Sequence, residues 1–236
     1  MANGNMKRLV ISLFAMLAMC SAWAGAEDDA LAAYQRKDYA TVLKIVRPPA
    51  QKGEAWAQAL LGDAYSFGRG VVQDHAEAVK WYRLAAPQGD AITQYNLGVM
   101  YDNGHGVPQD FKEAARWYKL AAAQGNADAQ LNLGSMHNKG QGVPQDFKEA
   151  VHWLKLAAAQ GNARAQNNLA GNYALGDGLL EDLVKAHMWA NLATMNGSKK
   201  GAELRDLIAK SMTQSQIVEA QKMARECLAR DYKMCN

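Results

Sequence analysis

The chain has 236 residues, of which 49% are hydrophobic and 21% are charged, and its formal net charge at neutral pH is +3. This length and apolar content are enough to bury a sizeable core. The charge is weak and scattered along the sequence. Binding to a phosphate backbone needs a concentrated basic field, so we expect no nucleic acid as a partner.

The first 24 residues have the pattern of a secretory signal peptide. Lys7 and Arg8 precede an apolar run over residues 9–19, and small residues follow at positions 22, 24 and 26. The run has 11 residues, whereas a membrane span needs ~20, so we expect cleavage near Ala24 or Ala26 rather than a retained anchor. The mature chain is then periplasmic or secreted, without a membrane span. Removing Lys7 and Arg8 from the 26 basic residues leaves 24 against 23 acidic ones, a net charge near +1.

Residues 27–52 are predicted to form a divergent N-terminal helix pair. We expect helices over residues 30–37 and 39–46, the second ended by Pro48 and Pro49. The segment lacks the Gly-x-Gly loops that recur later in the chain. Terminal units of repeat proteins commonly differ from the inner units in this way.

From Gly53 to Gly197 one block is written four times, with a period of 36 residues. Its tryptophans fall at positions 81, 117, 153 and 189, and its glycines include positions 89, 125, 161 and 197. A period of this size marks stacked supersecondary units, none of which can bury its apolar face alone. We place the four repeats at about residues 53–88, 89–124, 125–160 and 161–196.

Each repeat is predicted to be a helix, a turn and a second helix. The first helices are expected to start near residues 55, 91, 127 and 163, and the second near the aspartates at 74, 110, 146 and 182. In the second repeat, Asp110 and Glu113 have the spacing of a capping box. Small residues recur where two helices must approach closely, as at Gly62, Gly98, Gly134 and Ala170.

Residues 198–236 are predicted to form C-terminal capping helices, over about 199–210 and 214–229, with Thr213 and Gln216 as a second capping box. Cys227 and Cys235 are expected to form a disulfide in an oxidising compartment, the alternative being two free thiols. Eight residues of helix would separate them by ~12 Å, whereas a disulfide needs Cα atoms within ~7 Å. The chain must therefore bend between residues 229 and 233 if the bond forms.

The repeat resembles those of Sel1-like proteins, relatives of the tetratricopeptide repeats. Its motifs read LGDAYSFGRG, LGVMYDNGHG and LGSMHNKGQG, followed by AVKWYRLAAPQG, AARWYKLAAAQG and AVHWLKLAAAQG. The fourth copy, with LAGNYALGDG and AHMWANLATMNG, departs from this pattern. The resemblance implies an all-α fold, a right-handed α-solenoid, that serves as a scaffold or adaptor for a protein or peptide partner.

Comparison of the four copies separates constant packing positions from variable ones. The variable positions of the first helix are spaced 3, 4 and 3 residues apart and therefore share one helix face. In tetratricopeptide-like stacks this face lines a groove, although a solvated helix face varies in the same way. The positions are Trp56, Ile92, Asp128 and Arg164, then Ala59, Tyr95, Leu131 and Asn167, then Asp63, Val99, Ser135 and Gly171, then Ser66, Asp102, Asn138 and Ala174.

An asparagine recurs inside this face, at Asn96, Asn132 and Asn168. Its amide offers both a donor and an acceptor, which suits the backbone of an extended peptide. The alternative is a structural bond to a neighbouring repeat. The candidate partner-binding residues are the three asparagines together with Trp56, Tyr95, Asp128 and Arg164.

Catalysis and cofactor binding find little support in the sequence. The five histidines show no metal-ligand spacing, and the Gly-x-Gly pairs follow predicted helices, so we expect no metal and no cofactor. Some cysteine-rich secreted relatives were described as β-lactamases, which makes a hydrolase the alternative class. No serine here is followed by lysine three residues later, as such enzymes require, so we expect no enzyme. A further alternative is an envelope regulator of a membrane sensor or cell-wall component.

Overall fold

The computed structural model describes residues 25–232 and 235, so the predicted signal peptide lies outside the described residues. All regular structure in the described residues is helical. Contacts divide them into an N-terminal unit, residues 25–93 and 105–107, and a C-terminal unit, residues 94–104 and 108 onward. Each unit is described by itself.

The N-terminal unit contains a helix over residues 25–35, α2 (Tyr39–Gln51), α3 (Ala55–Phe67), α4 (His75–Ala85), the short helix η1 (Ala86–Gln88) and the start of α5 (Ala91–Asn103). Its core includes Val42, Val46 and Leu61. The predicted stop at Pro48 is wrong, because α2 continues through both prolines to Gln51. Pro49 and Ala50 are buried, and this packing offsets the backbone hydrogen bonds that two prolines remove.

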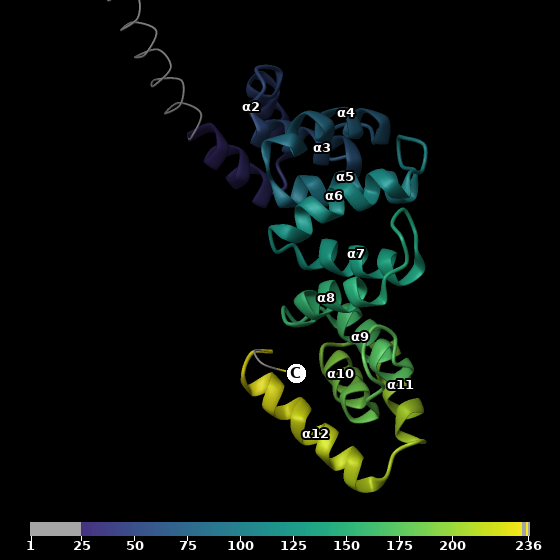
Figure 1. The fold of residues 1–236 in the computed structure, drawn as a ribbon. Helices are drawn as coiled ribbons and strands as arrows, with labels where there is room; N and C mark the ends of the chain where they lie inside the picture. Colours follow the sequence, from purple (N-terminus) through teal and green to yellow (C-terminus); the bar gives the residue numbers. More distant parts are fainter. Residues whose placement is uncertain (1–24, 233–234, 236) are drawn as a thin grey trace, which may run out of the picture. The chain divides into compact units, whose positions relative to one another are not determined.

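The C-terminal unit contains the rest of α5, then α6 (Phe111–Ala123), α7 (Ala127–Lys139), α8 (Phe147–Ala158), α9 (Ala163–Leu175), α10 (Leu183–Met195), α11 (Lys199–Ala209) and α12 (Gln214–Ala229) (Figure 1). Helices α6 to α10 each pack on the next helix in the chain. The first helix α9 also contacts the first helix of the preceding repeat, α7, and the capping helix α11. This second set of contacts brings the variable faces of successive repeats together.

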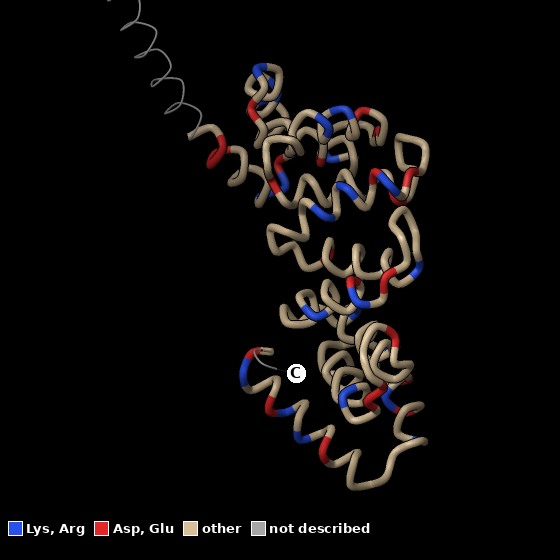
Figure 2. The backbone as a smooth tube through the Cα atoms, viewed as in Figure 1, with Lys and Arg blue, Asp and Glu red and all other residues tan. Residues whose placement is uncertain are grey.

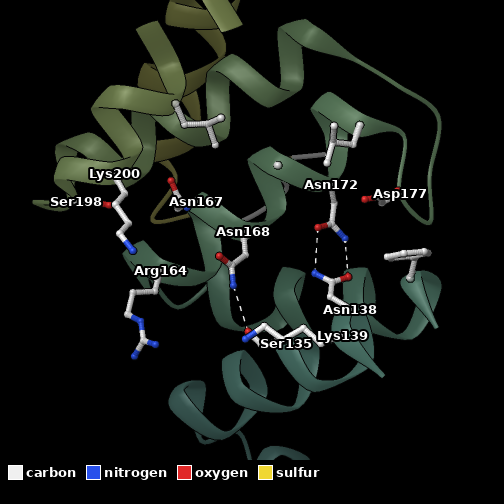
Figure 3. Close-up of a pocket in the computed structure, with 14 residues that line it drawn as sticks. Ser135, Asn138, Lys139, Arg164, Asn167, Asn168, Asn172, Asp177, Ser198 and Lys200 are labelled. Atoms are coloured by element: carbon white, nitrogen blue, oxygen red, sulfur yellow. Dashed lines mark hydrogen bonds between the residues drawn. The ribbon is translucent and has the colours of Figure 1, made fainter. Parts of the chain in front are cut away.

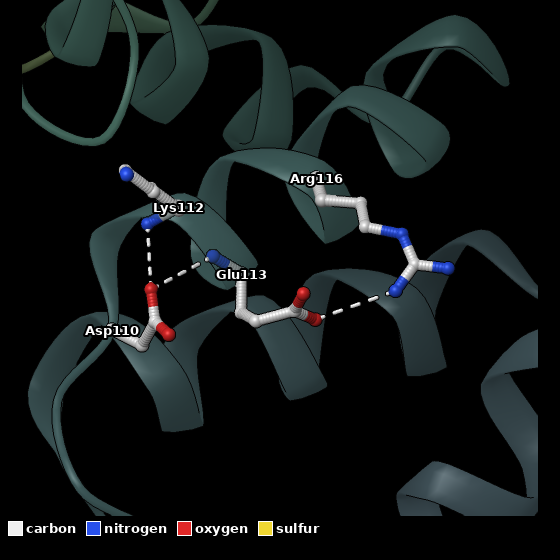
Figure 4. Close-up of polar contacts among 4 residues, drawn as sticks. All are labelled: Asp110, Lys112, Glu113 and Arg116. Carbon is white, nitrogen blue, oxygen red and sulfur yellow. Dashed lines mark hydrogen bonds and ion pairs between the residues drawn. The ribbon is translucent and has the colours of Figure 1, made fainter.

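The helix starts predicted from the repeat are confirmed. The first helices begin at Ala55, Ala91, Ala127 and Ala163, and Asp74, Asp110, Asp146 and Asp182 cap the second helices. Only one of the two hydrogen-bond interactions of the capping box predicted at Asp110 and Glu113 is present. Asp110 accepts bonds from the backbone of the first turn, but the Glu113 carboxylate turns to Arg116, 3.4 Å away (Figure 4).

The reason for this half-formed box lies in the preceding loop. In a complete capping box the Asp110 N–H would donate a hydrogen bond to the Glu113 carboxylate. Here it already donates to the Tyr101 carbonyl at 2.9 Å. Asp146 donates to the His137 carbonyl in the same way, at 3.0 Å. The Gly-x-Gly loop thus closes back on the first helix and leaves the glutamate free for a surface pair. A complete capping box is present at Thr213 and Gln216, as predicted.

Close helix approach explains the small residues of the first helices. A Cβ added at Gly98 would lie 2.7 Å from the ring of Tyr118, and one at Gly134 would lie 2.9 Å from Leu154. In the fourth repeat the facing position is Ala190 rather than tyrosine or leucine. The smaller partner makes room for the Cβ of Ala170 at the position that is glycine in the other copies.

The C-terminal helix covers the last repeat. Helix α12 packs on α10, and its Ala220, Ala224 and Cys227 belong to the same core cluster as Trp189. Charged residues of both signs are distributed along α12 (Figure 2). Cys227 and Cys235 are joined in a disulfide with a Cα separation of 5.1 Å. The helix ends at Ala229, and the positive φ angles of Asp231 and Tyr232 turn the chain back.

Candidate binding site on the first helices of the repeats

A ladder of side-chain amides fixes each helix pair. Gln130 on α7 is buried, donates to the Ala122 carbonyl at 3.1 Å and accepts from Gln160 at 2.9 Å. Gln166 on α9 is fully buried and forms the equivalent bonds with Ala158 and Asn196. Buried amides with both ends satisfied hold the helices in one register. Sequence reasoning missed this ladder, although glutamine recurs at positions 58, 94, 130 and 166.

Between α7, α9 and α11 the structure has a cavity of about 580 Å³. That volume lies within the range of sites that bind small molecules or short segments. Helix α7, helix α9 and the start of α11 supply most of its lining (Figure 3). From these elements come Ser135, Asn138 and Lys139, then Arg164, Asn167, Asn168, Gly171 and Asn172, then Ser198, Lys200 and Leu204.

Amide side chains link the two helices that form the floor of the cavity. Asn138 and Asn172 form a reciprocal pair, in which each amide nitrogen donates to the other's oxygen at 3.2 Å (Figure 3). Asn168 donates to the Ser135 hydroxyl at 3.2 Å, and that hydroxyl donates to the Leu131 carbonyl at 2.9 Å. These bonds hold the α7 and α9 faces at a fixed spacing.

Asn167 is the amide of the cavity that remains available. It forms no hydrogen bond within the described part of the chain, and its Oδ1 atom is buried without a donor. A buried acceptor without a partner costs roughly 1–3 kcal/mol.

Positively charged side chains outnumber negatively charged ones in the lining of the cavity. Lys139, Arg164 and Lys200 line it, against the single carboxylate of Asp177. None of the three cations lies within 4.0 Å of a carboxylate oxygen among the described residues. Arg164 and Lys200 extend on the same side of the cavity, whereas Asp177 lies on the other side of Asn172 (Figure 3). The cavity is therefore cationic at one end.

The predicted asparagines have different roles in the structure. Asn168 lines the cavity and also bonds to Ser135 of the preceding repeat. The structural alternative therefore applies at Asn168. Asn132 is half-buried on α7 and does not line the cavity. Asn96 is half-buried on α5 and does not line the cavity.

The other predicted residues do not gather at one place. Arg164 lines the cavity, but Asp128 lies outside it and accepts a bond from Asn162 at 3.0 Å. Tyr95 is half-buried, with its ring centroid 5.8 Å from that of Tyr118. Trp56 packs against the core of the N-terminal unit. The cavity thus takes in two of the predicted binding residues, Asn168 and Arg164.

The variable face is less open than predicted. Leu131 is 1% exposed and Ser66 is 4% exposed, so variation at these positions reflects core packing rather than a free surface. Sequence reasoning also missed Asn172, which is 5% exposed. A signal was available, because Asn172 occupies the place of Met100 and Met136 in the two preceding copies. A buried amide at an apolar position of a repeat requires a partner, here Asn138.

No metal centre is formed by the described residues, since no group of three or more His, Cys, Asp or Glu side chains comes together there. None of the described helices is long and apolar enough to cross a membrane.

The repeats identify the family. The Sel1 repeat family matches residues 57–90, 91–126, 127–162 and 163–198. The chain therefore belongs to the Sel1 repeat family, whose members generally serve as scaffolds for protein–protein interaction and typically are not catalytic.

Two solved structures resemble the chain over most of its length. One is a protective antigen present in uropathogenic Escherichia coli strains, with 32% identity and a TM-score of 0.75, over 83% of this chain and 42% of that one. The other is a Sel1 repeat protein from Oxalobacter formigenes, with 27% identity and a TM-score of 0.70, over 82% and 84% of the two chains. These similarities confirm the all-α solenoid class. The chain spans less than half of the E. coli antigen, and the search of curated proteins gave no match.

Proposed function

We propose that the protein is an exported scaffold that binds a segment of a protein partner in the cavity between α7, α9 and α11. The observation that carries the proposal is the cavity itself, about 580 Å³ and lined by the amides of successive first helices. Asn167 offers a donor and an acceptor to a bound backbone. The apolar side chains of Phe147, Leu175 and Leu204 offer contacts for a side chain of the partner.

A pair of exposed leucines provides the test of the binding site. Leu175 lines the cavity and is 74% exposed, whereas Leu180 is 89% exposed and lies outside it. A photoreactive phenylalanine analogue is placed at each position in turn, and crosslinking is carried out in living cells. We expect a discrete crosslinked product from position 175 and none from position 180.

Filling the cavity shows whether the crosslink depends on it. A Cβ at Gly171 would meet no atom within 4 Å, and this residue lines the cavity. Gly171→Leu should therefore leave the fold intact, occupy the cavity and abolish the product at position 175. Equal crosslinking from both leucines, or a product that persists in Gly171→Leu, would contradict the proposal.

Export is part of the proposal and has its own measurement. The basic and apolar pattern of residues 7–19 and the Cys227–Cys235 disulfide both suit an exported protein. Mass spectrometry of the protein isolated from its native cells should find an N-terminus immediately after Ala24 or Ala26. Recovery of the uncleaved chain from the cytoplasm would show that export is wrong.

We propose no hydrolase activity for the scaffold, since Ser-x-x-Lys is missing from the sequence. A chromogenic β-lactam offered to the mature protein should not be turned over. Turnover that tracks the protein through purification would favour the hydrolase alternative. If the crosslinked partner is a membrane sensor or a cell-wall protein, the scaffold acts as an envelope regulator.

A further inference from the structure

The cationic end of the cavity indicates the chemistry of its occupant. Arg164 comes from α9 in the fourth repeat and Lys200 from α11, the helix that follows the repeats, so two different helices bring positive charge to one cavity. Neither side chain has a carboxylate partner within 4.0 Å among the described residues. Two neighbouring cations repel each other, and an anion placed between them would relieve that repulsion.

The remaining walls distinguish a peptide from other anions. Beside the two cations lie the Asn167 and Asn168 amides, which suit a peptide backbone. Leu175 and Phe147 also line the cavity and offer apolar contact. Only three cations line the cavity and the chain as a whole is nearly balanced in charge, whereas a nucleic acid would require a long basic surface.

We infer that the occupant is an acidic peptide segment, with a carboxylate held between Arg164 and Lys200. This inference rests on the proposed binding function of the same cavity. The segment runs over Asn167 and Asn168 towards Asp177. The Asp177 carboxylate repels a second acidic group at the far end, so the segment carries its negative charge at the Arg164 end. The cavity thus selects for the position of the charge as well as for its sign.

The probe is a phage-displayed library of random linear peptides, selected on the mature protein. Selected sequences are then synthesised with a fluorescent label, and their dissociation constants are measured by anisotropy. We expect enrichment of Asp and Glu at one end of the selected sequences. Each charge-assisted bond is expected to change the dissociation constant about tenfold.

Matched variants assign the effect to the two cations. Arg164→Gln and Lys200→Gln should each weaken binding of the acidic peptides about tenfold. Lys199→Gln is the control, because Lys199 is the exposed neighbour of Lys200 and does not line the cavity. It should leave binding unchanged. In the double variant Arg164→Glu, Lys200→Glu, selection should shift from acidic to basic peptides.

The outcomes separate this inference from the proposed function. Peptides that are lost in Gly171→Leu but show no acidic enrichment would overturn the acidic segment and leave the binding cavity in place. Acidic peptides that bind equally to Lys199→Gln, Arg164→Gln and Lys200→Gln would also overturn it. A selection that yields no peptide whose binding is lost in Gly171→Leu would contradict both proposals.

Discussion

The close approach of α5 and α6 allows a prediction with a built-in control. A Cβ at Gly98 would lie 2.7 Å from two ring carbons of Tyr118, whereas ordinary carbon contacts are about 3.5–4.0 Å. The ring cannot yield easily, because Tyr118 is fully buried and its hydroxyl donates to Asp102 at 3.1 Å. Gly171 lies on α9 with nothing within 4 Å of the same added atom. Identical substitutions at these two glycines should therefore have opposite effects.

The magnitudes follow from overpacking and helix propensity. Overpacking a filled core costs roughly 1–3 kcal/mol, and replacing a mid-helix glycine by alanine recovers roughly 0.5–1 kcal/mol. Gly98→Ala should then lower the free energy of unfolding by about 1–2 kcal/mol. Gly171→Ala should raise it by about 0.5–1 kcal/mol. The assay is urea unfolding of the purified protein, followed by far-ultraviolet circular dichroism.

A double-mutant cycle isolates the contact. The fourth repeat places Ala170 and Ala190 at the positions of Gly98 and Tyr118, so the double variant Gly98→Ala, Tyr118→Ala reproduces that pairing. In the Tyr118→Ala background, Gly98→Ala should no longer destabilise the protein. The coupling energy should be about 1–3 kcal/mol, equal to the overpacking cost. If Gly98→Ala proves as stable as Gly171→Ala, or if its cost persists without the tyrosine ring, the close-approach argument is wrong.

Three further predictions concern the amide ladder, a buried histidine and the disulfide. Gln166→Leu removes the two hydrogen bonds of a buried amide and should cost about 2 kcal/mol of unfolding free energy, whereas Gln221→Leu, at an exposed position, should not. Burial, and then the charge of Arg205, lower the pKa of His187 below its ordinary value of 6.5. As the pH falls below 6.5, the unfolded chain binds a proton at this histidine more readily than the folded chain does. The free energy of unfolding should therefore fall as the solution is acidified. His187→Val should remove that part of the pH dependence, and an unchanged pH profile would refute the assignment. Reducing the Cys227–Cys235 bond should lower the unfolding free energy by about 2–3 kcal/mol, and a double Cys→Ala variant should not respond to the reductant.

The repeat made most of the fold predictable. Constant Trp, Gly and Ala positions gave the helix starts, and the Asp caps gave the second helices, because these depend on local geometry that each copy repeats. The two predictions of the fold that were wrong concern the ends of single helices. The extension of α2 past Pro48 depends on burial of Pro49 against the unit core. The half-formed box at Asp110 depends on a loop carbonyl, at Tyr101, that the spacing does not reveal.

The site was predictable only in part. Periodicity placed Arg164, Asn167 and Asn168 on one helix face, and the structure finds all three in the cavity. It could not reveal that Asn138 and Asn172 satisfy each other across two repeats, since that pairing depends on the distance between α7 and α9. Lys200 was beyond sequence reasoning for the same reason, because it comes from a helix outside the repeats.

The sequence by itself thus determined the class of fold, because a 36-residue period leaves stacked helix pairs as the way to bury the apolar faces. Only the tertiary structure decided which of the variable side chains are free. Leu131 and Asn172 are buried by neighbouring helices, whereas Arg164 and Lys200 remain beside an open cavity without a carboxylate partner among the described residues. The physical reason is that periodicity fixes the direction of a side chain within its helix, while its partners depend on how closely the next helix approaches.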